Sequence, residues 1–419
     1  MKKLKAGSLQ LVTFVVVVIA LLLSAFIMLI HIHRQFRLKT DHIIDTVGLT
    51  HHGINQTLYN NLKYEDTVAI DLNSEDYKSL QVHKSFWGIY EKVHTTATVK
   101  TFSLKKTALV GAIQIETKQP TLVLKDNNKP LVLVGHTIID GDAYLPERGI
   151  KSGNIAGTSY YRETYINGKI SESKGLPKIE ANLLNYINTL EHYSAFRETN
   201  KDDLSLEHSK QHNNTFENTE KRIYSSNDLY LSDIEITGHI SIHSETKIVI
   251  DKSAQLTDVI LIAPIIEIKD YVCGTFQVFA TKQIDVGKHV VLDYPSTLLL
   301  KNDVSKNDKD KANMIFIDNH SIIKGHIVSL GKTASDNYEP QIKINPSTLI
   351  KGVIYCQQNL ELRGTVDGSV FTNNFIIKEA GSIYQNHLYN AKISNDALDS
   401  RFITLPFENS KKDIAKWLY

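Results

Sequence analysis

The chain has 419 residues, with 47 basic and 46 acidic side chains and an apolar fraction of 42%. This length allows two or three domains with an apolar core. Because the charges nearly cancel, no overall field would attract nucleic acid or an anionic surface, and we predict no nucleic-acid partner. Two cysteines, Cys273 and Cys356, exclude a disulfide framework but leave a single bridge open.

The N-terminus carries an uncharged apolar run from Leu11 to Ile30. About 20 apolar residues in a helix, rising roughly 1.5 Å each, span the ~30 Å hydrocarbon layer of a bilayer. A cleaved signal peptide is the alternative, but its apolar region is typically about 7–15 residues long and ends in a small-residue cleavage site. We therefore predict that residues 1–31 form a short tail and a transmembrane helix, with the lipid bilayer as its partner.

The charges on the two sides of this run bear on its orientation. The lysines at positions 2, 3 and 5 are balanced by Arg34, Arg37 and Lys39 on the other side. The very short tail with its free amine favours a cytoplasmic N-terminus. The bulk of the chain would then lie on the periplasmic, or extracytoplasmic, side of the cell membrane, while the inverted orientation remains an alternative.

Residues 32–65 show apolar side chains at spacings of three, four and seven, which are typical of an amphipathic helix. These side chains are Phe36, Ile43, Val47, Ile54, Leu58 and Leu62. The pattern predicts that the membrane helix continues as a stalk. Gly48 and Gly53 lie inside it, and each costs about 1 kcal/mol relative to alanine, so a break near them is expected.

Residues 66–134 change to a period of two, which predicts a small antiparallel β region. Its last two strands, residues 121–124 and 131–134, are separated by a short polar segment and are expected to form a hairpin. A long N-terminal helix followed by a small antiparallel sheet resembles the layout of pilins and pseudopilins, the minor pilins in particular. One departure bears on processing and polymerisation: five residues after Gly7, Val12 stands where those proteins carry a glutamate.

Residues 135–390 repeat, and their spacing predicts a right-handed β-helix, or β-solenoid. Blocks of 18 residues that begin at 247, 265 and 283 place apolar residues in three columns: Ile248, Ile266 and Ile284; Ile250, Ile268 and Val286; Ala254, Val272 and Val290. Four segments share a glycine-containing turn between β-branched residues, and they begin at Ile236, Ile323, Ile350 and Val366. Each coil of a solenoid can bury its apolar side chains only against the neighbouring coils.

Three segments interrupt or follow these coils. Residues 174–228 are expected to form a polar and helical insertion, with Leu183, Leu184, Ile187 and Leu190 at helical spacing and a polar loop over 197–222. A second polar loop is expected over 301–313. The C-terminal tail, residues 391–419, is expected to pack as a terminal helix, with a docking peptide as the alternative.

The glycine-containing turns, especially across 320–390, resemble those of bactofilins and related polymer-forming β-helical proteins. That resemblance implies a scaffold or assembly function, because bactofilins polymerise through the ends of their solenoids.

Histidine pairs are the first candidates for a chemical site, because histidine is the commonest ligand of transition metals. His31 and His33 are one pair, and His51 and His52 are the other. Neither pair belongs to an H-E-x-x-H motif or has a nearby cysteine, so we predict no metal site and no cofactor.

Acidic residues are the second candidates, because paired carboxylates can cleave glycosidic bonds. Asp140 and Asp142 form one set, and Asp251, Glu267 and Asp285 form another. A D-G-D triplet is first of all a turn, however, and acids between buried strand positions usually serve solubility. Because phosphate-binding loops and nucleophile elbows are also missing from the sequence, we predict no catalytic residue. Cys273 and Cys356 alternate with apolar neighbours and are interpreted as small core residues.

The sequence thus predicts a non-catalytic, membrane-anchored extracytoplasmic protein with a structural role, as an envelope scaffold, an adhesin or a component of a pilus-like or secretion assembly. Self-association or binding to envelope proteins would follow from this role. One alternative is a membrane-tethered protein that binds or degrades polysaccharide. The other is a cytoplasmic-facing, bactofilin-like scaffold.

Overall fold

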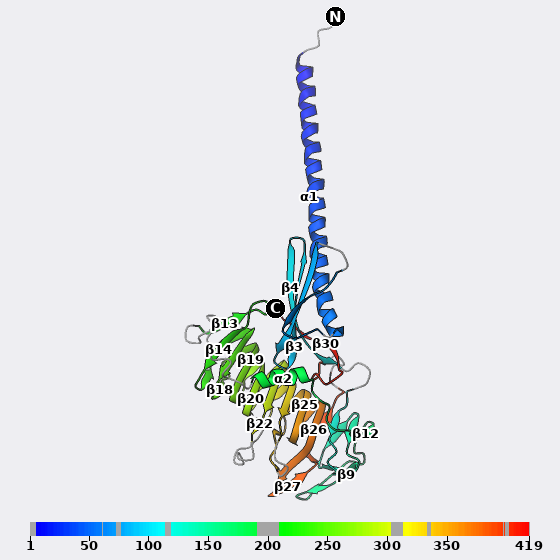
Figure 1. Cartoon of the computed structure of the whole chain (residues 1–419), viewed down its shortest axis with the longest axis vertical. Helices are drawn as coiled ribbons and strands as arrows, with labels where there is room; N and C mark the ends of the chain where they lie inside the picture. Colours follow the sequence, from blue (N-terminus) through cyan, green and yellow to red (C-terminus); the bar gives the residue numbers. More distant parts are fainter. Residues whose placement is uncertain are drawn as a thin grey trace.

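The computed structural model describes residues 6–60, 62–72, 77–113, 119–190, 209–302, 313–332, 337–396, 398 and 402–418. The fold is mainly β. One long helix, a small antiparallel sheet and a larger set of parallel strands follow one another along the long axis of the molecule (Figure 1).

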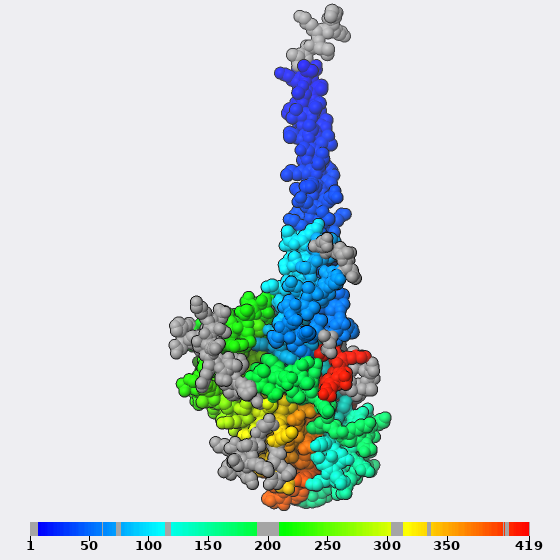
Figure 2. Space-filling view, viewed as in Figure 1, coloured from blue at the N-terminus to red at the C-terminus, as the bar shows by residue number. Residues whose placement is uncertain are grey.

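Helix α1 (Ala6–Tyr59) is a single continuous element of 54 residues. Its first part projects alone from the molecule, and its apolar side chains are exposed there (Figure 2). Among the described residues it is the one helix that is long and apolar enough to cross a membrane. The predicted break near Gly48 and Gly53 is wrong, because α1 continues through both residues. Gly53 lies where the helix packs on the sheet, and a Cβ there would come within 3.0 Å of Leu80 and Thr95.

The antiparallel sheet has the strand order β1-β2-β3-β4-β30. The strands are β1 (Asp66–Ala69), β2 (Lys78–Trp87), β3 (Tyr90–Val99), β4 (Phe102–Ile113) and β30 (Lys411–Leu418). One face of this sheet packs on α1, where Ile54, Leu80, Val82 and Val93 form a shared apolar cluster. The predicted C-terminal helix is therefore wrong: the tail forms strand β30, which supplies β4 with a hydrogen-bonded neighbour along its second edge.

The predicted hairpin over residues 121–134 is also wrong. Strand β5 (Leu122–Leu124) lies between β8 and β26 and β6 (Leu131–Val134) lies between β9 and β28, and all four pairings are parallel. Every residue of these two short strands is buried, as is typical of strands in parallel sheets. The N-terminal strands of the antiparallel sheet therefore end at Ile113, well before the predicted boundary at residue 134.

The remaining strands are mostly parallel, and most of them join β5 in one closed barrel of hydrogen-bonded neighbours. Helix α2 (Ala181–Leu190) lies outside the barrel. The elements are β7 (Ile138–Asp140), β8 (Ala143–Leu145), β9 (Ile150–Ser152), β10 (Asn154–Ile155), β11 (Thr158–Ser159), β12 (Ile170–Glu172), β13 (Gln211–Asn214), β14 (Lys221–Ser225), β15 (Leu229–Leu231), β16 (Glu235–Gly238), β17 (Ile240–Ser244), β18 (Lys247–Ile250), β19 (Gln255–Ile268), β20 (Cys273–Val286), β21 (Val291–Lys301), β22 (Met314–Ile317), β23 (Ile322–Leu330), β24 (Ile342–Ile344), β25 (Leu349–Leu362), β26 (Thr365–Glu379), β27 (Ser382–Gln385), β28 (His387–Tyr389) and β29 (Lys392–Ser394).

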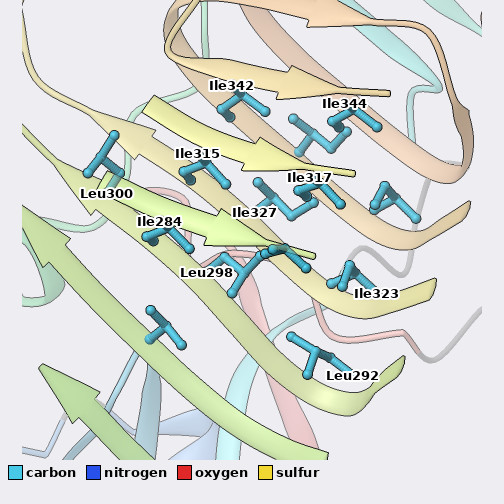
Figure 3. Packing of buried hydrophobic residues seen from close by; sticks show 14 of the residues in the cluster. Ile284, Leu292, Leu298, Leu300, Ile315, Ile317, Ile323, Ile327, Ile342 and Ile344 are labelled. Atoms are coloured by element: carbon cyan, nitrogen blue, oxygen red, sulfur yellow. The ribbon is translucent and has the colours of Figure 1, made fainter. Parts of the chain in front are cut away.

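The apolar columns expected from the repeat are confirmed by the strand register. Ile248 pairs with Ile266, and Ile266 pairs with Ile284. The same column continues through Ile315 and Ile342, whose side chains point into one common interior (Figure 3). The strands therefore bury their apolar side chains against one another from rung to rung, as the spacing indicates.

The order of strands in the barrel differs from their order in the chain. Strands β5 and β7, which come early in the sequence, pair with β26 and β29, which come late. Strands β13 and β14 pair with β16 and β17, so the ladder includes part of the predicted insertion. Parallel pairing extends from Leu122 of β5 to Ser394 of β29, beyond both predicted ends of the solenoid at 135 and 390. Helix α2 confirms the helical part of that insertion. Residues 197–208 and 303–312 of the two predicted polar loops lie outside the described residues. The described part of the first loop, residues 209–222, contains β13 and the start of β14, so the loop prediction is wrong there.

Candidate functional site

The tip of the β2–β3 hairpin is held on the barrel by one glutamine side chain. Gln277 accepts a hydrogen bond at Oε1 from the backbone N–H of Ile89, at 3.0 Å, and donates one from Nε2 to the carbonyl of Trp87, at 3.0 Å. Gly88, between them, has a φ of +66°, which a side chain would disfavour. The Trp87 indole also donates to the carbonyl of Asp258 at 3.1 Å. The sheet and the barrel are therefore joined by specific, buried contacts.

An apolar and aromatic layer surrounds this tip. It includes Leu183 and Ile187 of α2, Phe279 of the barrel and Ile403 of the C-terminal segment, all buried in one cluster. Inside it, the Tyr90 hydroxyl and His326 Nδ1 share a hydrogen bond of 2.9 Å. Because α1 packs on the other face of the sheet, the chain is continuously packed from the helix to the barrel.

A buried cluster of charges lies beside the hairpin, at the edge of the same layer. The side chains of Lys84 and Glu91 are 1% and 2% exposed, and Lys84 Nζ lies 3.2 Å from Glu91 Oε2. Lys412 of β30 donates to Glu91 Oε1 at 2.6 Å, and the Tyr64 hydroxyl also donates to Glu91. Lys84 Nζ lies 4.1 Å from the centre of the Tyr64 ring. One carboxylate thus joins three separate segments of the chain.

Burial and charge shift the pKa values of this cluster in opposite directions. Burial lowers the pKa of Lys84, although Glu91 opposes that shift. Burial also acts against the charge of Lys412, but Glu91 outweighs it and raises the pKa of Lys412. Burial, reinforced by Glu91, raises the pKa of Tyr64. Lys412 and Glu180 also line a surface depression of about 400 Å³, in which opposite charges face one another.

The histidine pairs predicted from the sequence do not form a metal site. His31 and His33 lie on the exposed part of α1, and His51 packs edge-on against Trp417. His51 Nε2 also lies 2.9 Å from Lys106 Nζ. Among the described residues, no group of three or more His, Cys, Asp or Glu side chains could hold a metal ion.

The candidate acids do not form one cluster, although Glu267 and Asp285 pair in register, and each acid has a local partner. Asp140 accepts from the Asn167 side chain at 2.8 Å, and Asp142 accepts from the Lys169 N–H at 2.9 Å. Asp251 accepts from Ser253, and Asp285 accepts from Gln283. Glu267 pairs with Lys247 and Lys269.

The two cysteines are free and have different environments. Cys356 is buried, and burial raises the pKa of its thiol to about 12, which makes it a core residue. Cys273 is exposed at the start of β20, so the expectation that it is a core residue is wrong for this position.

Sequence reasoning missed an exposed column of three aromatic rings on the barrel. The Tyr271 ring stacks on His289 at 5.0 Å, and His289 stacks on His320 at 5.1 Å, with 9° between the planes in each pair. All three residues are exposed and occupy left-handed turns, with φ values of 66°, 57° and 63°. The available signal was position, because each ring comes two residues before a strand, at Cys273, Val291 or Ile322.

Three buried histidines are expected to make the fold sensitive to acid. Burial lowers the pKa of His239 and His243 to about 4 and that of His326 to about 3, and the Lys92 ammonium adds to the effect at His239. An unfolded chain would protonate these groups near pH 6.5.

We expect the free energy of unfolding to fall as the pH is lowered from about 6.5 toward about 4, by up to about 1.4 kcal/mol per pH unit for each histidine. The sign follows because the unfolded state binds more protons than the folded state in this range. Denaturant titrations of the detergent-solubilised chain at a series of pH values would measure it. Equal stability across the range would contradict the prediction.

No protein-family model matches the sequence, and no curated protein or solved structure shows significant similarity to the chain. The geometry described above therefore carries the functional argument by itself.

Proposed function

We propose that this chain is a membrane-anchored extracytoplasmic structural protein, an envelope scaffold, adhesin or assembly component that is not an enzyme. One observation carries the proposal: α1 leaves Leu11–Ile30 uncovered and buries Thr46, Thr50, Ile54 and Thr57 against the sheet. The same helix that would cross the membrane is thus part of the folded unit. A protein built in this way holds its barrel at a set distance from the bilayer.

The exposed segment of α1 between the apolar run and the sheet determines that distance. Residues 31–45 would extend about 22 Å if the helix stood upright, at 1.5 Å per residue. Lys78 of β2 lies 3.2 Å from Asp45, which marks the level on the helix where the sheet begins. An upright helix would therefore keep the barrel clear of the lipid headgroups, and the barrel surface would remain available to partners.

We further propose that the barrel is coiled as a right-handed β-helix and that the protein self-associates or binds envelope proteins. Parallel pairing at an offset of 18 residues, as between Ile248 and Ile266, supports a coil. The resemblance to pilins rests on the helix and the antiparallel sheet, and the resemblance to bactofilins rests on the glycine-containing turns. An experimental structure would establish the hand of the coil, and a left-handed coil would reject this part of the proposal.

Labelling of Cys273 with a membrane-impermeant maleimide tests the orientation, because this thiol is exposed whereas Cys356 is buried. In cells whose outer barrier has been opened, we expect Cys273 to be labelled as fully as after lysis. Cys273→Ser is the matched control and should abolish the signal. Labelling that appears only after lysis would reject the extracytoplasmic placement and favour the cytoplasmic-facing scaffold.

A second candidate function is polysaccharide binding by the tethered barrel, and the column formed by Tyr271, His289 and His320 favours it. This function is compatible with the structural role, because an anchored protein that binds a wall or capsule polymer would hold it near the membrane.

A further inference from the structure

The face of α1 that packs on the sheet continues toward the apolar run as an uncovered stripe. Thr46 and Thr50 are buried on this face. Ile43 lies three residues before Thr46, Phe36 lies seven before Ile43, and Ile32 lies four before Phe36, so the same side of the helix carries them all. Ile32, Phe36 and Ile43, which we call the stalk stripe, are 42%, 65% and 49% exposed.

The opposite face of the same segment is charged. Arg34, Arg37, Asp41 and Asp45 follow one another at steps of three, four and four, and all four are exposed. The first charge after the apolar run is therefore Arg34 on this face, whereas Lys39 is the first charge on the face of the stalk stripe. Charged side chains of a membrane helix lie at the headgroups or beyond them. Lipid should consequently cover the stripe face further along the helix than the charged face.

This asymmetry defines the direction and size of a lean. Arg34 and Lys39 are five residues apart, about 7.5 Å along the axis, on different sides of a helix about 10 Å across. A bilayer surface that passes both residues would meet the helix at a tilt of roughly 35–40°, within the range found for membrane helices. The stalk stripe would face down into the lipid, and the sheet, which packs on the same face, would lie beneath the leaning helix.

The part of the sheet that would then meet the headgroups is the β3–β4 turn, formed by Lys100 and Thr101. This turn rises beside α1 (Figure 1). The Phe102 ring lies 6.4 Å from the His42 ring, which places the turn about 18 Å beyond the end of the apolar run. Lys100 Nζ lies 5.5 Å from the centre of the exposed Tyr77 ring. A tyrosine beside a lysine is typical of residues at the headgroup level of a membrane.

We propose that α1 leans toward its sheet side and that the stalk stripe and the β3–β4 turn rest on the headgroup layer of the protein's own bilayer. Lipid is the occupant because the stripe is continuous with the apolar run. A second copy fits poorly, because the sheet occupies the same face from Thr46 onward and two facing copies would place both sheets between their helices. The height calculated for an upright helix is then an upper limit.

This inference rests on the membrane anchor of the proposed function but not on its orientation, because the turn and the emerging helix lie on the same side of the bilayer. The test uses the full chain in phosphatidylcholine nanodiscs that contain lipids with a spin label on the headgroup. Cys273→Ser removes the exposed thiol, and Cys356 is buried. A fluorescent probe is then attached at Thr101→Cys or at Asp41→Cys.

Thr101 and Asp41 are both exposed and lie at similar levels along α1, but on different sides of it. We expect the probe at position 101 to lose at least about twice as much emission as the probe at position 41, since a lean of this size brings the turn several ångströms closer to the headgroups. An upright helix would give equal losses, or a larger loss at position 41.

One substitution should remove the difference, and a matched one should not. Phe36→Lys places a charge on the stalk stripe near the level of Arg34, so the helix should stand upright and the two probes should lose similar emission. Leu38→Lys is the matched control. Leu38 is also exposed, at 48%, but it lies four residues after Arg34 and three before Asp41, on the charged side. The difference between the probes should persist in this variant.

A probe at Ser24→Cys, inside the apolar run, separates failure of the lean from failure of the anchor. Lipids with a spin label on the acyl chain should quench this probe, and a lack of quenching would reject the membrane anchor itself. With the anchor inserted, the lean is overturned by equal quenching at positions 41 and 101 or by a Phe36→Lys variant that keeps the difference. Discs that hold two copies, by light scattering, with position 101 protected from the quencher would assign the stripe to a second copy instead.

Discussion

Gly352→Ala is expected to prevent the barrel from folding, or to lower its free energy of unfolding by more than about 3 kcal/mol. Gly325, Gly352 and Gly368 pair in register across three adjacent strands. A Cβ atom on Gly352 would overlap the carbonyl oxygen of Gly325, and the residue has a φ of 149°. Because the obstacle is backbone held on both sides by hydrogen bonds, rotation of a side chain cannot relieve the overlap.

Gly381→Ala is the matched control for this glycine column. Gly381 also has a positive φ, of 76°, but a Cβ there would meet nothing within 4 Å. Strain of the backbone alone should cost about 1–2 kcal/mol. Thermal unfolding followed by circular dichroism, together with protease resistance, would compare the two variants. Equal losses would show that close approach of the strands at Gly352 is not what requires glycine.

Glu91→Gln is expected to lower the free energy of unfolding by about 3–5 kcal/mol. Removal of this carboxylate would leave two ammonium groups, those of Lys84 and Lys412, beside each other with Lys84 only 1% exposed. A buried charge without its counter-charge is among the most destabilising changes a single substitution can make. Denaturant titration of the variant would measure the loss.

Two further variants separate this charge effect from a general loss of packing. Glu267→Gln removes a carboxylate that also contacts two lysines, but Glu267 is partly exposed and should cost no more than about 1 kcal/mol. Adding Lys84→Met to Glu91→Gln should restore part of the stability, because it removes one of the unpaired charges. A double variant less stable than Glu91→Gln would contradict the electrostatic explanation.

The Glu91 prediction concerns the antiparallel sheet, which lies between the anchor and the barrel. Glu91 and Lys412 join β3 to the C-terminal strand, while Gln277 joins the barrel to the β2–β3 tip. If either connection is lost, we expect the sheet and barrel to move more independently. A scaffold that must hold its barrel at a set height above a membrane would then lose that property before it loses its secondary structure.

The amino-acid sequence determined the local features of this protein. The apolar run Leu11–Ile30 indicated the exposed length of α1, because helix length and apolar composition are visible without knowledge of partners. The columns through Ile248 and Ile250 appeared in register as expected, because repeated coils bury equivalent positions. The antiparallel strands up to Ile113 followed from alternation with a period of two.

Only the tertiary structure decided which distant segments meet. Strand β5 pairs with β26 across more than two hundred residues, and β30 completes a sheet begun near the N-terminus. Gln277, Glu91 and the stacked rings of Tyr271, His289 and His320 likewise depend on neighbours that no local pattern specifies. The physical reason is that a periodic pattern shows only which side of a helix or strand is buried. Which segment packs on that side depends on the topology of the whole chain.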